Sequence, residues 1–365
     1  MKQEVRFRVD SGYNVAIVAG MVNGAGSAYY SYGATAVGNG LVPTEDTVFE
    51  IGSITKVFTT LLLADMAAGG KVSLDGTLAD YLPSTALPRG RGRAINLEQL
   101  ATHRAGLPRL PDNLDLSDPD RPYAGYTVRD LYSYLSRFLP SVEAEERYSY
   151  SNLDVGLLGH ILERRTESSY EDLVAGRITT GLGMTETRVA ATSEIRVRMA
   201  RGHSGVAEVP NWENTTLAGS GRLLSTARDM FTFLDANTGL KDTPLLSSML
   251  QTHEPRLPTG EQDVEIALGW HVRTVVDRQI VWHDGGTGGY ASYVGFVRDG
   301  GTGVVVLSNT FESVNDIGLH LLAPDVPMNV MPAPAQIDSA TLERYAGSYE
   351  FGQGGTLVWN CGMAI

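Results

Sequence analysis

The chain has 365 residues, of which 42% are hydrophobic, so it is long enough for one large domain or two closely joined ones. It carries 29 Lys and Arg against 42 Asp and Glu, and the net charge of −13 would repel nucleic-acid phosphates and anionic lipids. We therefore expect no nucleic-acid partner. The single cysteine, Cys361, cannot form an internal disulfide, and the seven histidines form no HExxH motif or Cys/His cluster, so we expect no metal site and no cofactor.

The N-terminal region contains a short apolar stretch at 15–22 that follows basic residues, as in a secretory leader. Glu4 and Asp10 interrupt the basic segment, and Asn23-Gly24 is typical of a hairpin turn, so we predict a strand over 15–22 that continues into a hairpin. No run approaches the ~20 apolar residues of a membrane span. The sequence favours a cytoplasmic protein, or a periplasmic or secreted one if a leader has been removed.

Residues 57–68, VFTTLLLADMAA, are apolar on nearly every side of a helix. The helix is expected to begin at Gly52-Ser53 and to end at Gly69-Gly70, because glycine commonly follows the last turn of a helix. This pattern predicts a helix that is buried all round.

The rest of the chain divides into a mainly helical part and a part rich in predicted strands. From about 75 to 225, short helical patterns alternate with Pro- and Gly-rich loops, and the irregular stretch 109–126 is long enough to indicate a functional loop. After residue 264, segments rich in β-branched and aromatic residues are separated by Gly and Asp, which predicts strands.

Strands at both chain ends around a helical middle predict an α+β fold. We expect one antiparallel sheet built from both chain ends, with flanking helices and an inserted, mainly helical region. The expected sheet domain comprises residues 1–75 and 226–325, and the helical domain comprises 76–225. Residues 326–365 are expected to form a tail that contains part of a small β unit.

Lys56 is one of only four lysines in the chain, and it follows Ser53 by three residues at the start of the predicted helix. At this spacing the two side chains share one helix face. A serine hydroxyl becomes a nucleophile when a neighbour takes its proton, and a lysine can do so when burial or positive charge lowers its pKa. The alternative is structural, with Ser53 as the helix N-cap and Lys56 as a solvated residue of the first turn.

Tyr150-Ser151-Asn152 stands just before a second apolar helical pattern. A tyrosine hydroxyl can relay a proton, and an asparagine amide can both hold a lysine and donate to a substrate carbonyl. In the structural alternative, Asn152 caps the helix and Tyr150 packs in the core.

His283-Asp284-Gly285-Gly286 ends one predicted strand and precedes another. The glycines would let a substrate lie against an exposed strand edge, where a backbone N–H can face a developing oxyanion. His283 could orient the site or balance its charge. The alternative is a glycine-rich hairpin turn beside a hydrogen-bonded core histidine.

In this order, S-x-x-K at 53–56, Y-S-N at 150–152 and H-x-G at 283–285 resemble the three active-site motifs of the penicillin-recognising serine hydrolases. The chain most resembles the branch related to class C β-lactamases, which also contains D,D-peptidases, D-aminopeptidases and β-lactamase-like carboxylesterases. Further stretches agree, among them INLEQLATHRAGLPRLPDN and GSGRLLSTARDMFTFL, so the resemblance spans roughly residues 12–310. The joint pattern favours the catalytic interpretation of each motif.

The resemblance implies an acyl-enzyme route in which Ser53 attacks a carbonyl. Lys56 and Tyr150 would share the work of general base and of returning a proton to the leaving group, and the sequence leaves open which of them is the base. The backbone N–H groups of Ser53 and Gly286 would form the oxyanion hole.

The resemblance also implies substrate-binding positions at Asn152, His283, Asp284 and Gly285. Asn152 would hold Lys56 and the acyl side of the substrate, and His283 would replace a lysine that is common in β-lactamases. Asp284 departs from the family pattern, in which a Thr or Ser hydroxyl helps to bind a substrate carboxylate. A carboxylate there would repel a substrate carboxylate, which favours neutral esters or substrates that bear an amine.

We therefore expect a serine hydrolase that cleaves small carboxylic esters through an acyl-enzyme on Ser53 and hydrolyses β-lactams weakly. The alternatives are a class C-like β-lactamase and a D-stereospecific peptidase, either a D,D-carboxypeptidase or a D-aminopeptidase. An alternative of another class is a penicillin-binding sensor that is acylated without turnover. The expected partner is a small-molecule ester, amide or β-lactam, and the sequence does not define an oligomeric state.

Overall fold

The computed structural model describes residues 1–140, 147–332, 339–351 and 355–359. The chain forms two compact units, Met1–Met328 and Asn329–Ile365. Cys361 lies outside the described residues. The division of the first unit into a sheet domain and a helical domain stays a prediction.

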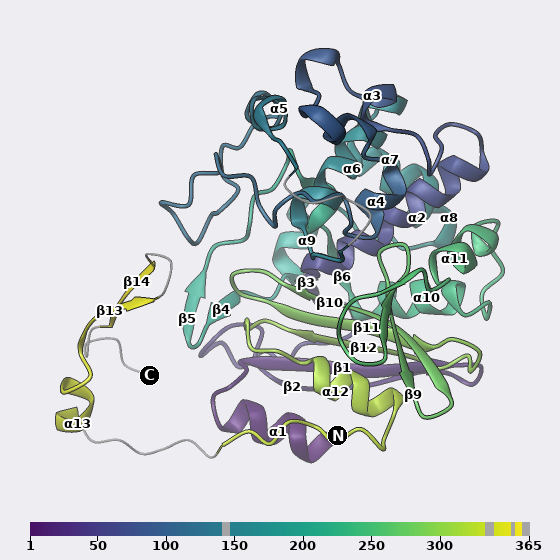
Figure 1. The fold of residues 1–365 in the computed structure, drawn as a ribbon. Coiled ribbons are helices and arrows are strands. Elements are labelled where there is room, and N and C mark those ends of the chain that lie inside the picture. Colours follow the sequence, from purple (N-terminus) through teal and green to yellow (C-terminus); the bar gives the residue numbers. More distant parts are fainter. Residues whose placement is uncertain (141–146, 333–338, 352–354, 360–365) are drawn as a thin grey trace. The chain divides into compact units, whose positions relative to one another are not determined.

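The first unit contains a large antiparallel sheet to which segments from both ends of the unit contribute (Figure 1). Strands β1 and β12, which come from opposite ends of the unit, pair from Ile17 opposite Ser308 to Val22 opposite Gly303. In spatial order the strands are β2 (Gly26–Gly33), β1 (Ala16–Asn23), β12 (Gly303–Ser308), β11 (Ala291–Val297), β10 (Arg278–Gly286), β9 (His271–Val275), β8 (Val264–Ile266) and β7 (Leu257–Pro258). The predicted α+β fold with one antiparallel sheet is confirmed, and so is the β1–β2 hairpin.

Helices surround this sheet and fill the middle of the chain (Figure 1). The helices of the first unit are α1 (Lys2–Asp10), α2 (Thr55–Ala68), α3 (Leu78–Tyr81), α4 (Leu97–Ala101), α5 (Val128–Arg137), α6 (Asn152–Thr166), α7 (Tyr170–Val174), α8 (Thr180–Leu182), α9 (Ser193–Arg198), α10 (Ala227–Asn237), α11 (Leu246–Thr252) and α12 (Asn315–Leu322). Within the part of the chain that is described, none of them combines the length and apolarity needed to cross a bilayer.

Both faces of the sheet are apolar and covered by helices. Successive side chains of a strand point to opposite faces. Ile17 of β1 accordingly packs in a cluster with α1 and α12, whereas its neighbour Val18 packs in the cluster that contains α2 and α10. The sheet therefore lies between two apolar layers. Helix α2 belongs to the larger of them.

Helix α2 is the buried helix predicted from the sequence. Apolar side chains on all its sides are inaccessible to solvent, and Phe58 stacks on Phe233 of α10 with ring centres 4.3 Å apart. The helix ends before Gly69, and Gly70 has the positive φ of 66° that suits the end of a helix. Because it is fixed on every side, α2 is a rigid support for the residues at its N-terminus.

Helix α1 was not predicted. It lies against the sheet through Val5, and the buried guanidinium of Arg8 bonds to Asp316 of α12, with Nη1 3.0 Å from Oδ1. This ion pair joins the two ends of the first unit.

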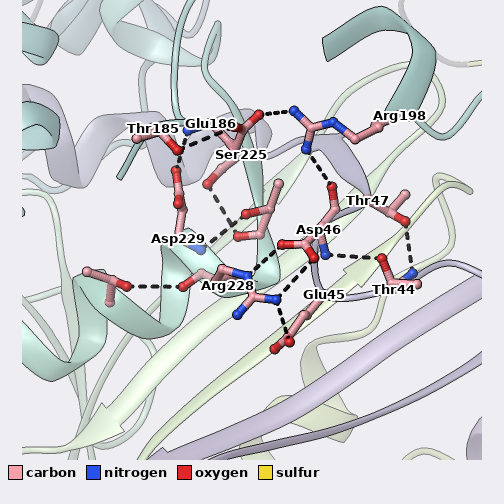
Figure 2. A network of polar contacts seen from close by, with 12 residues as sticks. Thr44, Glu45, Asp46, Thr47, Thr185, Glu186, Arg198, Ser225, Arg228 and Asp229 are labelled. Carbon is pink, nitrogen blue, oxygen red and sulfur yellow. Dashed lines mark hydrogen bonds and ion pairs between the residues drawn. The ribbon is translucent and has the colours of Figure 1, made fainter. Parts of the chain in front are cut away.

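Two shorter strand pairs lie outside the main sheet: β3 (Val48–Glu50) with β6 (Leu224–Thr226), and β4 (Gly202–Ser204) with β5 (Ala207–Val209). A polar network holds the segment before β3 (Figure 2). In it Arg228 of α10 donates to Asp46 at 2.6 Å and to Glu45 at 2.7 Å, and Arg198 of α9 pairs with Glu186. Each exposed ion pair of this kind contributes about 0–1 kcal/mol.

The second unit contains α13 (Ser339–Glu343) and the antiparallel strands β13 (Gly347–Phe351) and β14 (Gly355–Trp359).

Candidate active site

Ser53 lies in a single 3-10 turn, η1 (Gly52–Ile54), between β3 and α2. Its side chain caps neither this turn nor α2, so the structural alternative in which Ser53 is an N-cap is wrong. Gly52 has a φ of +49°, and a Cβ there would lie 2.7 Å from the backbone nitrogen of Gly286. A glycine is therefore required to bring the serine turn against the end of β10.

Lys56 is fully buried, which excludes the alternative of a solvated first-turn lysine. Its Nζ lies 2.8 Å from Ser53 Oγ, 2.9 Å from Asn152 Oδ1 and 2.7 Å from the carbonyl oxygen of Ser220. Burial lowers the pKa of Lys56 well below its usual range, Arg109 lowers it further, and Asp284 opposes the shift. The lysine next to Ser53 is thus in an environment that favours its neutral form.

Tyr150 lines the same cavity as Ser53 and lies close enough for the serine hydroxyl to act on the pKa of its phenol. Burial raises the pKa of Tyr150 well above its usual value, so the phenol keeps its proton at neutral pH. Lys56 Nζ lies 4.8 Å from the centre of the tyrosine ring. Of the two candidate bases, Lys56 is the one whose environment favours the unprotonated form, which is the form that can take the proton of Ser53.

Asn152 is the first residue of α6. Ser151 is the actual N-cap, with its hydroxyl 3.0 Å from the backbone nitrogen of Asp154, so the alternative in which Asn152 caps the helix is wrong. Asn152 Oδ1 accepts from Lys56, and its Nδ2 donates to the hydroxyl of Tyr123 at 3.1 Å. Asn152 thereby connects the buried lysine to the cavity beside it.

Strand β10 brings the third motif to the same place. Asp284 lines the cavity, where Asn315 Nδ2 donates to its Oδ2 at 2.9 Å. A side chain at Gly285 would collide with the carbonyl oxygen of Ile51, which leaves only glycine at this position. Gly286 lies opposite Ala291 at the end of the β10–β11 ladder. The motif therefore forms one wall next to the serine turn.

His283 is placed differently from the expectation. His283 is fully buried and is not among the described residues that line the cavity. Its position therefore does not allow direct contact with a substrate. Its Nδ1 donates to the carbonyl oxygen of Asp284 at 2.5 Å, and burial lowers the pKa of the imidazole well below its usual range. A neutral His283 adds no positive charge, and its ring centre lies 6.3 Å from that of Tyr150.

These residues surround a cavity of about 650 Å³. The predicted residues that line it are Ser53, Tyr150, Asn152, Asp284, Gly285 and Gly286. The sequence analysis missed Arg109, Tyr123 and Asn315 as individual lining residues. Arg109 and Tyr123 belong to the loop 109–126, whose irregular length was the available signal, whereas nothing in the sequence pattern singles out Asn315.

Among the residues that the structure describes, no group of three or more His, Cys, Asp or Glu side chains could hold a metal ion. The chemistry available in the cavity is that of a serine hydroxyl in contact with a buried lysine and near a protonated tyrosine, with backbone N–H groups close by. Such a set of groups suits nucleophilic attack on a carbonyl.

Fold and site together define a serine hydrolase of the type built on an S-x-x-K motif, with an antiparallel sheet beside a helical region. The Beta-lactamase family model matches residues 4–323, and the chain belongs to the β-lactamase family. The resemblance inferred from the three motifs is confirmed.

Several known proteins are similar over most of the chain. It is 26% identical over 327 residues to the D-alanyl-D-alanine-carboxypeptidase/endopeptidase AmpH of Escherichia coli (strain K12), which covers 82% of this chain and 83% of that protein. It is 28% identical over 291 residues to Penicillin-binding protein 4 of Amycolatopsis lactamdurans, which covers 74% of each chain. A crystal structure of a class C β-lactamase from Rhodobacter sphaeroides superposes with a TM-score of 0.73 and 27% identity, covering 83% of this chain and 91% of that one.

Proposed function

We propose that this protein hydrolyses small carboxylic esters through an acyl-enzyme formed on Ser53. The observation that carries the proposal is the contact of Lys56 Nζ with Ser53 Oγ at 2.8 Å, at the edge of a cavity that also contains the carboxylate of Asp284. The first feature supports acyl transfer, and the second supports neutral or amine-bearing substrates.

In acylation, Ser53 Oγ attacks the ester carbonyl carbon while its proton passes to the neutral amine of Lys56. The carbonyl oxygen becomes an oxyanion that accepts from the backbone N–H groups of Ser53 and Gly286, and one such donor is typically worth about 10²- to 10³-fold in rate. The bond to the alcohol oxygen then breaks. Tyr150 delivers a proton to that oxygen and regains one from the lysine ammonium.

In deacylation, a water molecule attacks the acyl carbon and gives its proton to the same base. The bond to Ser53 Oγ breaks, the serine recovers its proton, and the carboxylic acid leaves. Asn152 would hold the acyl side of the substrate, since its amide already connects Lys56 to the cavity.

Substrate choice rests on Asp284. An ionised carboxylate in the cavity repels a substrate carboxylate and cannot donate a hydrogen bond to it. Asn315 satisfies one oxygen of Asp284, which stabilises the side chain as an acceptor at the cavity wall. This favours neutral esters and substrates that bear an amine over β-lactams and peptides that end in a carboxylate.

The decisive experiment compares kcat/KM for p-nitrophenyl butyrate with kcat/KM for a chromogenic cephalosporin. The proposal predicts that the ester is preferred. A preference for the cephalosporin by orders of magnitude would overturn the assignment as an esterase and leave the acyl-enzyme route in place.

A second candidate is a D-stereospecific peptidase or a class C-like β-lactamase, and it is favoured by the names of the similar proteins, which include a D-alanyl-D-alanine-carboxypeptidase/endopeptidase. The same comparison, extended to a D-alanyl-D-alanine peptide and to a D-amino-acid amide, separates these activities. A non-turnover sensor is separated by intact mass, because its Ser53 adduct would persist after excess substrate is removed.

A further inference from the structure

The cavity contains a positive side chain that the reaction above does not use. Arg109 lines the cavity with Ser53, and its guanidinium carbon lies 5.2 Å from the centre of the Tyr150 ring. Lys56 Nζ lies 4.8 Å from the same point. The two groups are therefore no more than about 10 Å apart, close enough for the charge of one to disfavour the charge of the other.

The backbone fixes Arg109 at this place. Its carbonyl oxygen accepts from the N–H groups of Asn152 at 3.1 Å and Leu153 at 3.2 Å, the first two residues of α6. The adjacent carbonyl of Pro108 accepts from the Ser151 hydroxyl at 2.7 Å. The loop is thus tied to the start of α6 by main-chain groups, and these contacts do not depend on the Arg109 side chain.

Of the two side chains Arg109 and Lys56, Arg109 is the one that stays charged. A guanidinium is not deprotonated in proteins, and the Arg109 residue is exposed, whereas Lys56 is fully buried. Within the described part of the chain, no carboxylate forms an ion pair with Arg109 that would cancel its charge. The repulsion between the two groups therefore acts on the proton of Lys56.

We propose that Arg109 is a positioning residue for the general base: its fixed positive charge adds to the effect of burial on Lys56 and so helps to set the lower end of the pH range in which Ser53 is acylated. The inference rests on the proposed function, because it takes Lys56 as the base. It assigns to the loop 109–126 an electrostatic role in catalysis rather than a contact with the substrate.

The other groups that face Lys56 fix the sign of the effect. Burial makes the largest contribution and lowers the pKa of Lys56, Arg109 lowers it too, and Asp284 raises it. Tyr150 is neutral because burial raises its pKa. Three buried histidines near the site are also neutral at pH 7, since burial lowers the pKa of each: His103, His271 and His283. Arg109 and Asp284 are thus the opposing fixed charges.

The test compares the pH dependence of kcat/KM for p-nitrophenyl butyrate in Arg109→Met, Arg109→Lys and the wild type. In the wild type, kcat/KM should rise to a plateau as Lys56 loses its proton. Arg109→Met should move this rise upward by about one pH unit, the size expected for one charge at this range, which is a loss of about tenfold on the acid limb. The plateau should be retained, and Arg109→Lys should stay close to the wild type.

The matched control is Arg121→Met, which removes an exposed positive charge from the same loop but not from the cavity wall, and its profile should equal that of the wild type. Two results would overturn the proposal: an unshifted profile in Arg109→Met, or an equal loss of kcat/KM at every pH. The second would indicate a substrate contact, and a rise in KM confined to carboxylate-bearing substrates would indicate the same.

A second measurement distinguishes a failure of the inference from a failure of the proposed function. The rate at which a fluorophosphonate labels Ser53, followed by intact mass, should show the same shift between the wild type and Arg109→Met. No labelling of the wild type at any pH would overturn the proposed function and the inference with it. Labelling with identical pH profiles in both proteins would overturn the inference alone.

Discussion

Lys56 Nζ lies 2.8 Å from Ser53 Oγ and also bonds to two acceptors from distant parts of the chain, Asn152 Oδ1 and the carbonyl oxygen of Ser220. A neutral amine has two N–H groups and one lone pair. The two fixed acceptors take the N–H groups, so the lone pair is left for the hydroxyl of Ser53. The surroundings of Lys56 therefore match the form of the lysine that accepts a proton.

Replacing this lysine should slow acylation strongly without unfolding the protein. Lys56→Met keeps the length of the side chain and removes a buried amine, so kcat for p-nitrophenyl butyrate should fall about 10²- to 10⁴-fold, the range of general acid–base catalysis. The melting temperature should fall only modestly, because removing the buried amine offsets part of the cost of leaving the oxygens of Asn152 and Ser220 without a donor. The control is Lys71→Met at an exposed position, which should keep full activity. Activity of Lys56→Met within tenfold of the wild type would exclude the lysine as the base.

Tyr150→Phe should separate proton donation to the leaving group from activation of the serine. The phenyl ring keeps its place beside Lys56, and only the phenol hydroxyl is lost. An ethyl ester needs a proton on its departing oxygen, whereas p-nitrophenolate leaves without one. We expect kcat to fall much more for ethyl butyrate than for p-nitrophenyl butyrate. Equal losses for the two esters would argue that Tyr150 acts before the leaving group departs.

The sheet and the buried helix could be predicted because their patterns are local. Apolar residues on all sides at 57–68 and β-branched segments after residue 264 leave few alternatives. Helix α1 could not be predicted, since Val5, Phe7 and Val9 alternate with charged residues as in a strand. What stabilises α1 comes from 308 residues away, where Arg8 bonds to Asp316.

The site was predictable where its motifs have fixed spacing, and the residues from the first two motifs do meet. Arg109 and Asn315 reach the cavity through tertiary packing, which leaves no periodic signal in the sequence. Adjacent residues of a strand point to opposite sides, so the sequence indicated that His283 and Asp284 have different surroundings, but not which of the two lines the cavity.

The stability of the protein should decrease in acid because of buried histidines. Burial lowers the pKa of His253 to about 3, below the unperturbed value of 6.5. The unfolded chain therefore binds the proton first, and the free energy of unfolding should fall as the pH drops from about 6.5 towards 3, by about 1.4 kcal/mol per pH unit for this residue. His253→Gln should remove that part of the slope in urea unfolding between pH 4 and 6. Parallel slopes in the two proteins would contradict the assignment.

Asp284→Asn should change substrate preference with little change in structure. The new amide oxygen can still accept from Asn315, which now donates to Asp284 at 2.9 Å, and only the negative charge is removed. We expect kcat/KM for carboxylate-bearing substrates, a chromogenic cephalosporin included, to increase about tenfold or more, the effect of about 1.4 kcal/mol of lost repulsion. Turnover of p-nitrophenyl butyrate should change much less. If both substrates respond alike, Asp284 does not select by charge.

Gly52→Ala tests whether the close approach of the serine turn to β10 is needed for acylation. An alanine Cβ would lie 2.7 Å from the nitrogen and 2.9 Å from the oxygen of Gly286, and the φ of +49° would be strained as well. The turn and the end of β10 must then move apart, which separates the N–H groups of Ser53 and Gly286. We expect kcat to fall about 10²- to 10³-fold, as when an oxyanion donor is lost.

The matched control for this variant is Gly183→Ala. Gly183 has a φ of +74° at the end of α8, and no atom lies within 4 Å of where its Cβ would be. The Gly183→Ala variant should therefore lose stability through backbone strain alone, by about 1 kcal/mol, and keep its activity. Urea unfolding and the rate of Ser53 labelling measure the two effects separately. If the two variants lose the same stability and label at the same rate, the contact between Gly52 and Gly286 has no role in forming the site.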